Sequence, residues 1–203
     1  MKKNLQVRYY SDVNPQDENM WALQPKHSID CINWNDFLYC PKVHFKIVHN
    51  GKMLYIKFDV TEDYEPRTVC TKDQGPVYQD SCVEFFILDK NGSYHNFEFN
   101  SNGICLSAQG EKRENRKQRT KDELSSIIRI PSKTEIIRKT HHWNLVIGIP
   151  FVTCELSRGN NYDVNFYKCG DLTTEKHYLS WNKINTLKPD FHRAEYFGTM
   201  ILE

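Results

Sequence analysis

The chain has 203 residues, of which 39% are hydrophobic, 26% charged and 13% aromatic. This composition is typical of a folded globular protein and excludes a disordered one, and the length suits one domain with its own core. The net charge of +1 argues against a function in which the protein binds nucleic acid or acidic membranes by electrostatic attraction.

The first residues, MKKNLQVRYYSDVNP, contain two lysines with no apolar run behind them. A secretory leader needs roughly 7–15 consecutive apolar residues, and a membrane span needs roughly 18. Neither occurs in the sequence as it stands. We therefore expect a cytoplasmic protein without a membrane partner, and the sequence gives no indication of its oligomeric state.

The cysteines indicate reduced thiols. Their number is odd, their spacing is wide, and no C-x-x-C pair occurs, which disfavours both a disulfide framework and a zinc ribbon. Cys82 sits within a hydrophobic run, where we expect it to be a small buried side chain. The seven are Cys31, Cys40, Cys70, Cys82, Cys105, Cys154 and Cys169.

The first predicted elements form a hairpin. HFKIV at 44–48 and MLYIKFDV at 53–60 flank Asn50-Gly51, a common two-residue hairpin turn. Residues 53–60 alternate between apolar and mixed positions, as in a strand with one buried face. The side chains expected on that face are Leu54, Ile56, Phe58 and Val60.

The next two predicted strands differ in their patterns. CVEFFIL at 82–88 is apolar on both faces, which is typical of a central strand. YHNFEFN at 94–100 follows the Asn91-Gly92 turn and alternates, so Phe97 and Phe99 point inward. The opposite face then carries three polar side chains: Asn96, Glu98 and Asn100.

Further strands are predicted at 127–130, 135–139, 143–149, 162–169 and 198–202, with short helices near 17–23 and 151–156. Many short strands separated by turns predict an all-β fold. We expect an antiparallel β-sandwich of jelly-roll or immunoglobulin-like type with one or two short helices. No repeat or linker is visible, so a single domain is expected over residues 1–203.

The segment 110–123, GEKRENRKQRTKDE, is highly charged. Because acidic residues are interleaved with the basic ones, we expect a solvated loop between strands. A patch that binds nucleic acid is the minor alternative.

Glu84 is the most informative single residue, because it lies within an apolar strand and a buried carboxylate is costly unless it has a partner. One interpretation is an internal salt bridge, for example to Arg67 or Arg113. The other is a carboxylate at the floor of a polar site, where it accepts hydrogen bonds from sugar hydroxyls.

Glu98 stands between Asn96 and Asn100 on one strand face. Amide and carboxylate groups in a row can bind neighbouring hydroxyls, although a solvent-facing strand would look the same. Glu84 and Glu98 could also form a glycosidase pair, which would have to flank a scissile bond at roughly 5–10 Å. The sequence contains no nucleophile, phosphate-loop or metal-ligand motif. A glycan-processing hydrolase is therefore kept only as an alternative.

Two aromatic residues lie where they could be exposed at the edge of a site. Tyr78 is in a turn-like segment just before the central strand, and Trp181 is in a polar stretch after HYLS. An exposed aromatic ring is often a binding group. Its flat face can pack against the C–H face of a pyranose.

The sequence resembles family-9-like carbohydrate-binding modules of the type found on some xylanases. The resemblance rests on PVYQDSCVEFF, YHNFEFN-x-x-G, NFYKCGD, HYLSW and PDFHRAEYFG in this order, from about Trp34 to the end. It implies a β-sandwich that holds a sugar between two aromatic rings, with carboxylate, amide and arginine groups reaching the hydroxyls.

Matched to this family, Tyr78 resembles one aromatic wall, where relatives usually have Trp, and Trp181 the other. Glu84 resembles the site carboxylate, and the row of Asn96, Glu98 and Asn100 a polar strand that lines the site. Some relatives carry structural calcium, for which the oxygen ligands here would be Asp59, Glu62, Asp63 and Asp80.

The resemblance thus implies non-catalytic binding of a mono- or oligosaccharide. Relatives are often secreted or periplasmic, and their binding modules usually serve an enzyme. Two alternatives remain beside the hydrolase: an interaction domain with a vestigial sugar slot, and a haem-binding relative of the same broad superfamily, which would need Met or His axial ligands.

Overall fold

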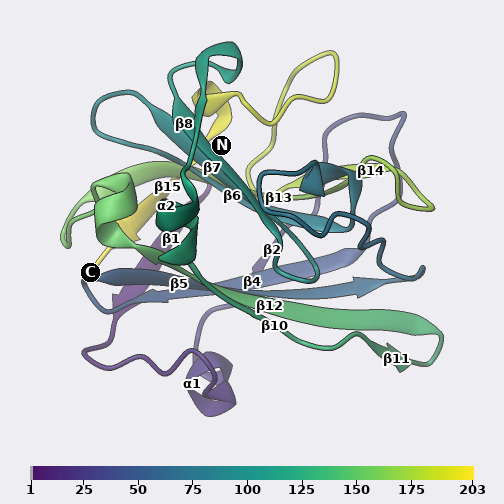
Figure 1. Cartoon of the computed structure of the whole chain (residues 1–203), viewed down its shortest axis with the longest axis horizontal. Coiled ribbons are helices and arrows are strands. Elements are labelled where there is room, and N and C mark those ends of the chain that lie inside the picture. The colour runs from purple at the N-terminus through teal and green to yellow at the C-terminus, as the bar shows by residue number, and fades with distance from the viewer. Residues whose placement is uncertain (1) are drawn as a thin grey trace.

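Strands dominate the computed structural model, which describes residues 2–203 and arranges its strands in two sheets. Sheet A runs in the order β1 (Asn4–Tyr9), β15 (Gly198–Leu202), β13 (Asn161–Gly170), β6 (Cys82–Leu88), β7 (Tyr94–Asn100), β8 (Cys105–Gly110) and β9 (Lys117–Gln118). Sheet B runs in the order β1, β4 (Lys42–His49), β5 (Met53–Glu62), β12 (Thr140–Pro150) and β10 (Ile128–Pro131). Figure 1 shows them as two stacked layers.

Strand β1 connects the two sheets. Its first four residues pair with β15 and its last two residues pair with β4, in both cases in parallel. The long neighbours β4–β5, β5–β12, β6–β7 and β6–β13 are all antiparallel. The predicted all-β antiparallel sandwich is therefore confirmed, with a parallel strand at the point where the sheets join.

Short strands complete the sheets. β11 (Glu135–Ile137) pairs with β12, β2 (His27–Ser28) with β4, and β14 (His177–Ser180) with both β13 and β3 (Cys31–Ile32). The α-helices are α1 (Glu18–Ala22) and α2 (Lys121–Ser125), and the 3₁₀ helices are η1 (Val77–Gln79), η2 (Arg113–Asn115), η3 (Phe151–Cys154) and η4 (Ala194–Tyr196). The helix expected near 151–156 is thus a single 3₁₀ turn.

The main core lies between the sheets. Alternation along β5 turns one face inward, as the sequence predicts, and the same holds for Phe97 and Phe99 of β7. Across the interface, Phe45 of β4 stacks on Phe166 of β13 with ring centroids 3.8 Å apart. Fully burying one such side chain contributes roughly 1.5–3 kcal/mol.

The outer faces of both sheets are also covered. On sheet B, α1 brings Trp21 against Val48, Tyr55 and Val146, and Figure 1 shows α1 outside that layer. On sheet A, a second apolar cluster joins Phe86 of β6 with side chains from the chain's C-terminal quarter. This double coverage explains why residues 82–87 are buried on both faces.

Two details differ from the sequence-based expectations. The strand predicted at 135–139 ends at Ile137, because Arg138 and Lys139 both have positive φ and turn the chain into β12. The charged segment 110–123 contains η2, β9 and the start of α2 rather than a plain loop. Within residues 2–203, no helix has the length and apolar character that crossing a bilayer requires.

Candidate functional site

A cavity of ≈170 Å³ lies on the outer face of sheet A. Its floor comes from four adjacent strands, β13, β6, β7 and β8, which contribute Cys169, Glu84, Glu98 and Leu106. Engineered cavities of about 150 Å³ accept a benzene ring, so the space suits one six-membered ring. The walls come from β14 and the surrounding loops: Tyr78, Arg113, Arg116, Asp171, Tyr178, Pro189, Asp190, Phe191 and His192.

Two carboxyl groups occupy the floor. Glu84 of β6 and Glu98 of β7 are direct partners in the antiparallel register, so both project from the same face of the sheet. Their side chains are only 3% and 4% exposed. Neither has a salt bridge within the described chain: Arg67 pairs with Asp80 instead. The interpretation of Glu84 as half of an internal ion pair is therefore wrong.

Hydrogen bonds to neutral groups hold the carboxyls in place. The Cys169 thiol donates to Glu84 Oε1 at 3.0 Å, and Asn96 Nδ2 donates to Glu98 Oε1 at 3.1 Å. Asn96 Oδ1 in turn accepts from Arg116 Nη1 at 2.9 Å. The two carboxyl groups are thus oriented toward the cavity while much of their hydrogen-bonding capacity stays open.

Burial decides the protonation of this pair. It raises the pKa of Glu84 well above the ordinary 4.5, and the neighbouring Cys169 and Glu98 add to the effect. Burial also raises the pKa of Glu98 to about 7, against the opposing pull of Arg116 and the Asn96 hydrogen bond. At neutral pH the pair therefore keeps at least one proton and can both donate and accept hydrogen bonds.

Two tyrosine side chains line the walls above the floor. Tyr78 of η1 is 39% exposed and lines one wall. Tyr178 of β14 lines the cavity as well, and its ring is held edge-on by Phe37 at 4.9 Å and by Phe191 at 6.0 Å. The cavity therefore has one exposed and one packed tyrosine ring.

Asp80 anchors the segment that carries Tyr78. Its carboxylate accepts hydrogen bonds from Arg67 Nη1 at 3.0 Å and from the backbone nitrogens of Val69 and Cys70. It also accepts from Asn100 Nδ2 at 3.0 Å. This explains the position of Asn100: its amide ties the Tyr78 segment to β7, and it is not among the residues that line the cavity.

The charged segment after β8 supplies the remaining wall. Gly110 lets it fold back over the sheet, because a Cβ at this position would lie 2.9 Å from Arg116 Cα. At the other end Arg119 is buried and donates to Ser107 Oγ and to His95. Fixed at both ends, the segment holds Arg113 and Arg116 over the cavity. Most of its residues are exposed, as expected for a solvated segment, but the segment also forms a wall of the cavity.

Trp181 lies on the opposite side of sheet A from the cavity. It is 3% exposed, in the core between the sheets, with its ring edge-on to Phe166 at 5.7 Å and to Phe45 at 6.2 Å. The structure brings Tyr78, Glu84 and Glu98 together, with Asn96 just behind Glu98. It does not bring Trp181 to them. Sequence reasoning missed Tyr178 and Arg116, and named Arg113 only as a candidate ion-pair partner of Glu84.

Two of the four carboxylates considered for calcium already have cationic partners. Glu62 contacts the Lys168 ammonium at 3.0 Å and accepts from Trp143 Nε1, and Asp80 pairs with Arg67. With these partners in place, neither side chain offers the free oxygens that calcium needs.

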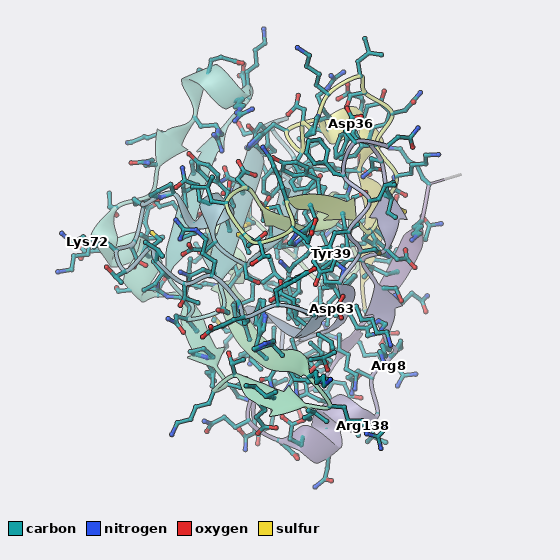
Figure 2. The ribbon with its side chains drawn as sticks, turned by 90° about the vertical axis from the view of Figure 1, so that its right-hand side faces the viewer. Arg8, Asp36, Tyr39, Asp63, Lys72 and Arg138 are labelled. Atoms are coloured by element: carbon teal, nitrogen blue, oxygen red, sulfur yellow. The ribbon has the colours of Figure 1, made fainter. Side chains whose placement is uncertain are left out.

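The other two carboxylates are separate from that pair and from each other. Asp59 and Asp63 lie in different surface hollows. Figure 2 shows Asp63 near Tyr39, whose hydroxyl accepts the Asp63 backbone N–H at 2.9 Å, with Arg138 farther along the same side. The four residues do not form a set of oxygen ligands that fits calcium.

One group of three side chains in residues 2–203 has the spacing of metal ligands, with its ligand atoms within 4.8 Å of one another: Cys82, Glu84 and Cys169. Burial raises the pKa of Cys82 to about 12, and the pKa of Cys169 is raised by its contact with Cys82 and by burial. Metal ligation requires thiolates. The group is therefore best described as hydrogen-bonded thiols beneath the cavity.

Comparisons with known proteins give a consistent result. The sequence profile of carbohydrate-binding family 9 matches residues 16–202. A crystal structure of a candidate carbohydrate-binding protein from Bacteroides uniformis superposes with a TM-score of 0.88 at 31% identity, covering 100% of both chains. No curated protein sequence matches the chain.

Two further structures share the fold. They are family 9 modules from Caldicellulosiruptor kristjanssonii in complex with glucose and with cellotriose, at 14% identity and TM-scores of 0.60 and 0.59. Each match covers 99% of this chain, and 96% and 94% of the respective modules. The profile match spans nearly the whole sequence, and the chain belongs to carbohydrate-binding family 9.

Proposed function

We propose that this protein binds a carbohydrate without reacting with it, and that one sugar ring occupies the cavity on the outer face of sheet A. The observation that carries the proposal is the buried Glu84–Glu98 pair at the floor of a ring-sized cavity with tyrosines in its walls. Membership of family 9 and the glucose and cellotriose complexes of two fold relatives support a sugar as the ligand.

The chemistry of the floor suits hydroxyl groups. A protonated carboxyl donates one hydrogen bond and accepts others, and an ionised one only accepts, so the pair can bind neighbouring hydroxyls of either polarity. The Arg116 guanidinium adds further donors. Because these groups are fixed by their own hydrogen bonds, little side-chain freedom is lost when a ligand binds.

The tyrosines supply the apolar contact. We propose that the exposed ring of Tyr78 packs against a C–H face of the sugar, with Tyr178 as a second ring in the cavity wall. Tyrosine combines a flat apolar ring with a polar tip, which suits a ligand whose faces are apolar and whose rim is polar. Trp181 has no part in this proposal, since it is enclosed in the core.

The geometry favours binding over hydrolysis. Glu84 and Glu98 rise side by side from one sheet face, so both approach a ligand from below. The two carboxyl groups of a glycosidase instead flank the scissile bond. A vestigial slot is disfavoured too, because the protein's own side chains leave a cavity of ≈170 Å³.

Calorimetric titration tests the proposal, with glucose, cellotriose, xylotriose and mannotriose as ligands, each with and without calcium. We expect saturable binding of at least one sugar, lost in Tyr78→Ala and largely kept in Tyr78→Phe. Tyr64→Ala is the matched control, since Tyr64 is 41% exposed but lies outside the cavity. Equal affinity in Tyr78→Ala and wild type would remove Tyr78 from the site.

An activity assay on the same sugars separates binding from catalysis. We expect no new reducing ends after prolonged incubation with the wild-type protein. Hydrolysis that disappears in Glu84→Gln would contradict the non-catalytic proposal and support the glycosidase.

A further inference from the structure

The cavity continues into a second hollow on the same face of sheet A. This hollow, of ≈470 Å³, is open and lies over β8 and β9. The two spaces share Leu106, Arg113 and Arg116 and therefore adjoin. A ligand whose ring fills the first space can extend a substituent into the second, past the two arginines.

Neither arginine forms an ion pair with any residue of the described part of the chain. Arg116 is fixed, because its Nε donates to the Arg113 carbonyl at 3.1 Å and its Nη1 to Asn96 at 2.9 Å, both neutral acceptors. Within residues 2–203 the Arg113 guanidinium donates no hydrogen bond and forms no salt bridge, and its side chain is exposed. One guanidinium is thus pre-positioned beside one that has all its donors free.

Acidic groups are distributed unevenly along the two spaces. Glu84, Glu98, Asp171 and Asp190 line the first space, and no acidic residue lines the second. The second has an apolar floor of Leu106 and Ala108 and, besides the arginines, the neutral Gln118. The acids of the segment 110–123 line neither space: Glu111, Glu114, Asp122 and Glu123. The open hollow is therefore a cationic extension of a cavity that is acidic at its other end.

Resting on the proposed function, we infer that the bound sugar carries an anionic substituent, a carboxylate or a sulfate ester, and that Arg113 and Arg116 bind it in the second hollow. Two guanidinium groups offer the forked donors that match both anions. The ligand class is therefore an acidic saccharide, with its ring over Glu84 and Glu98 and its charge over β8.

The test uses matched ligands that differ at a single position. Glucose, galactose and mannose are titrated beside their uronic acids and their 6-sulfates, at low and at high salt. We expect at least one anionic form to bind about tenfold more tightly than its neutral parent at low salt, with the advantage reduced at high salt. The uronic acid and sulfate arms identify which anion the arginines prefer.

Arg113→Gln tests the assignment without removing a contact of the fold, because the Arg113 guanidinium has no hydrogen-bond or salt-bridge partner among the described residues. We expect it to weaken binding of the anionic sugar about tenfold more than binding of its neutral parent. Lys112→Gln is the matched control, with the same charge change in the same segment at a residue that lines neither space. Lys112→Gln should alter neither the affinity for the anionic sugar nor the affinity for the neutral sugar.

Three results overturn the inference. If a neutral sugar binds and its anionic forms bind no better, the inference fails and the proposed function stands. If Lys112→Gln weakens anionic binding as much as Arg113→Gln, the effect is one of general charge and not of this hollow. If none of these sugars nor the neutral oligosaccharides bind, both the inference and the proposed function fail.

Discussion

Glu84 and Glu98 lie directly opposite each other on β6 and β7, with both side chains buried at the floor of the cavity. Two carboxyl groups that face each other on adjacent strands repel each other when both are ionised. The pair therefore retains a proton, and its titration is a property of both residues together. This relationship makes the stability of the protein depend on pH.

The first prediction concerns that pH dependence. Burial raises the pKa of Glu98 from 4.5 to about 7, so the folded protein binds more protons than the unfolded chain between these values. This contribution is fully present below pH 4.5 and is lost as the pH rises toward 7. Glu98→Gln removes the titrating group. We expect the stability of the variant relative to wild type to rise across this window, by on the order of 1 kcal/mol per pH unit.

Urea unfolding at pH 5, 6, 7 and 8 measures this difference. Glu65→Gln, which removes a carboxylate from an exposed position outside the cavity, is the control. Parallel stability profiles for Glu98→Gln and wild type would show that the Glu98 carboxyl does not titrate in this range.

The second prediction separates core from site at Trp181. Trp181→Ala should destabilise the protein by about 3–5 kcal/mol, because it removes a ring enclosed by Phe45 and Phe166. Trp181→Phe should cost less and keep its sugar affinity. The measurements are urea unfolding and calorimetric titration. Loss of sugar binding in a folded Trp181→Phe protein would show that Trp181 is part of the sugar-binding site.

The third prediction concerns the anchor of the Tyr78 segment. Asp80→Ala removes the acceptor for Arg67, Asn100 and two backbone N–H groups, and leaves a partly buried guanidinium unpaired. We expect a loss of about 3–5 kcal/mol in the free energy of unfolding. Sugar affinity should also fall, because η1 and its tyrosine lose their tie to β7.

A double substitution checks the cause. Adding Arg67→Met to Asp80→Ala removes the stranded charge and should recover part of the stability but none of the sugar affinity. If Asp80→Ala leaves both stability and affinity unchanged, the segment is held by other contacts.

The fourth prediction concerns the buried ion pair that joins β13 of sheet A to β5 of sheet B. Lys168 is fully enclosed and contacts Glu62 at 3.0 Å and His177 Nε2 at 2.8 Å. Lys168→Met leaves Glu62 buried without its cation and should cost about 3–5 kcal/mol. Combining it with Glu62→Gln should restore much of that loss, since the uncompensated charge is gone.

This double-mutant cycle is read by thermal or urea unfolding, and the coupling between the two positions is its result. Sugar binding serves as the control, because Lys168 and Glu62 do not line the cavity. If the losses of stability in the two single variants simply add in the double variant, Lys168 and Glu62 do not stabilise each other.

The strand pattern and the two faces of the central strands could be predicted from the sequence alone. Alternation with a period of two placed Phe97 and Phe99 inward and Asn96, Glu98 and Asn100 on the other face, as observed. The unbroken apolar run around Glu84 predicted a strand buried on both sides and an acid that needs an explanation. These are local properties, because neighbouring side chains in a strand must alternate.

The tertiary structure alone decided which residues meet at the cavity. Asn96, Glu98 and Asn100 share a face, yet only Glu98 lines the cavity, because Asn100 is held by Asp80 and Asn96 by Arg116. Trp181 sits in a polar stretch of sequence but packs into the core. Arg113 and Arg116 reach the site because their segment folds back at Gly110. Such long-range packing depends on how both sheets and their loops come together, and no spacing along the chain encodes it.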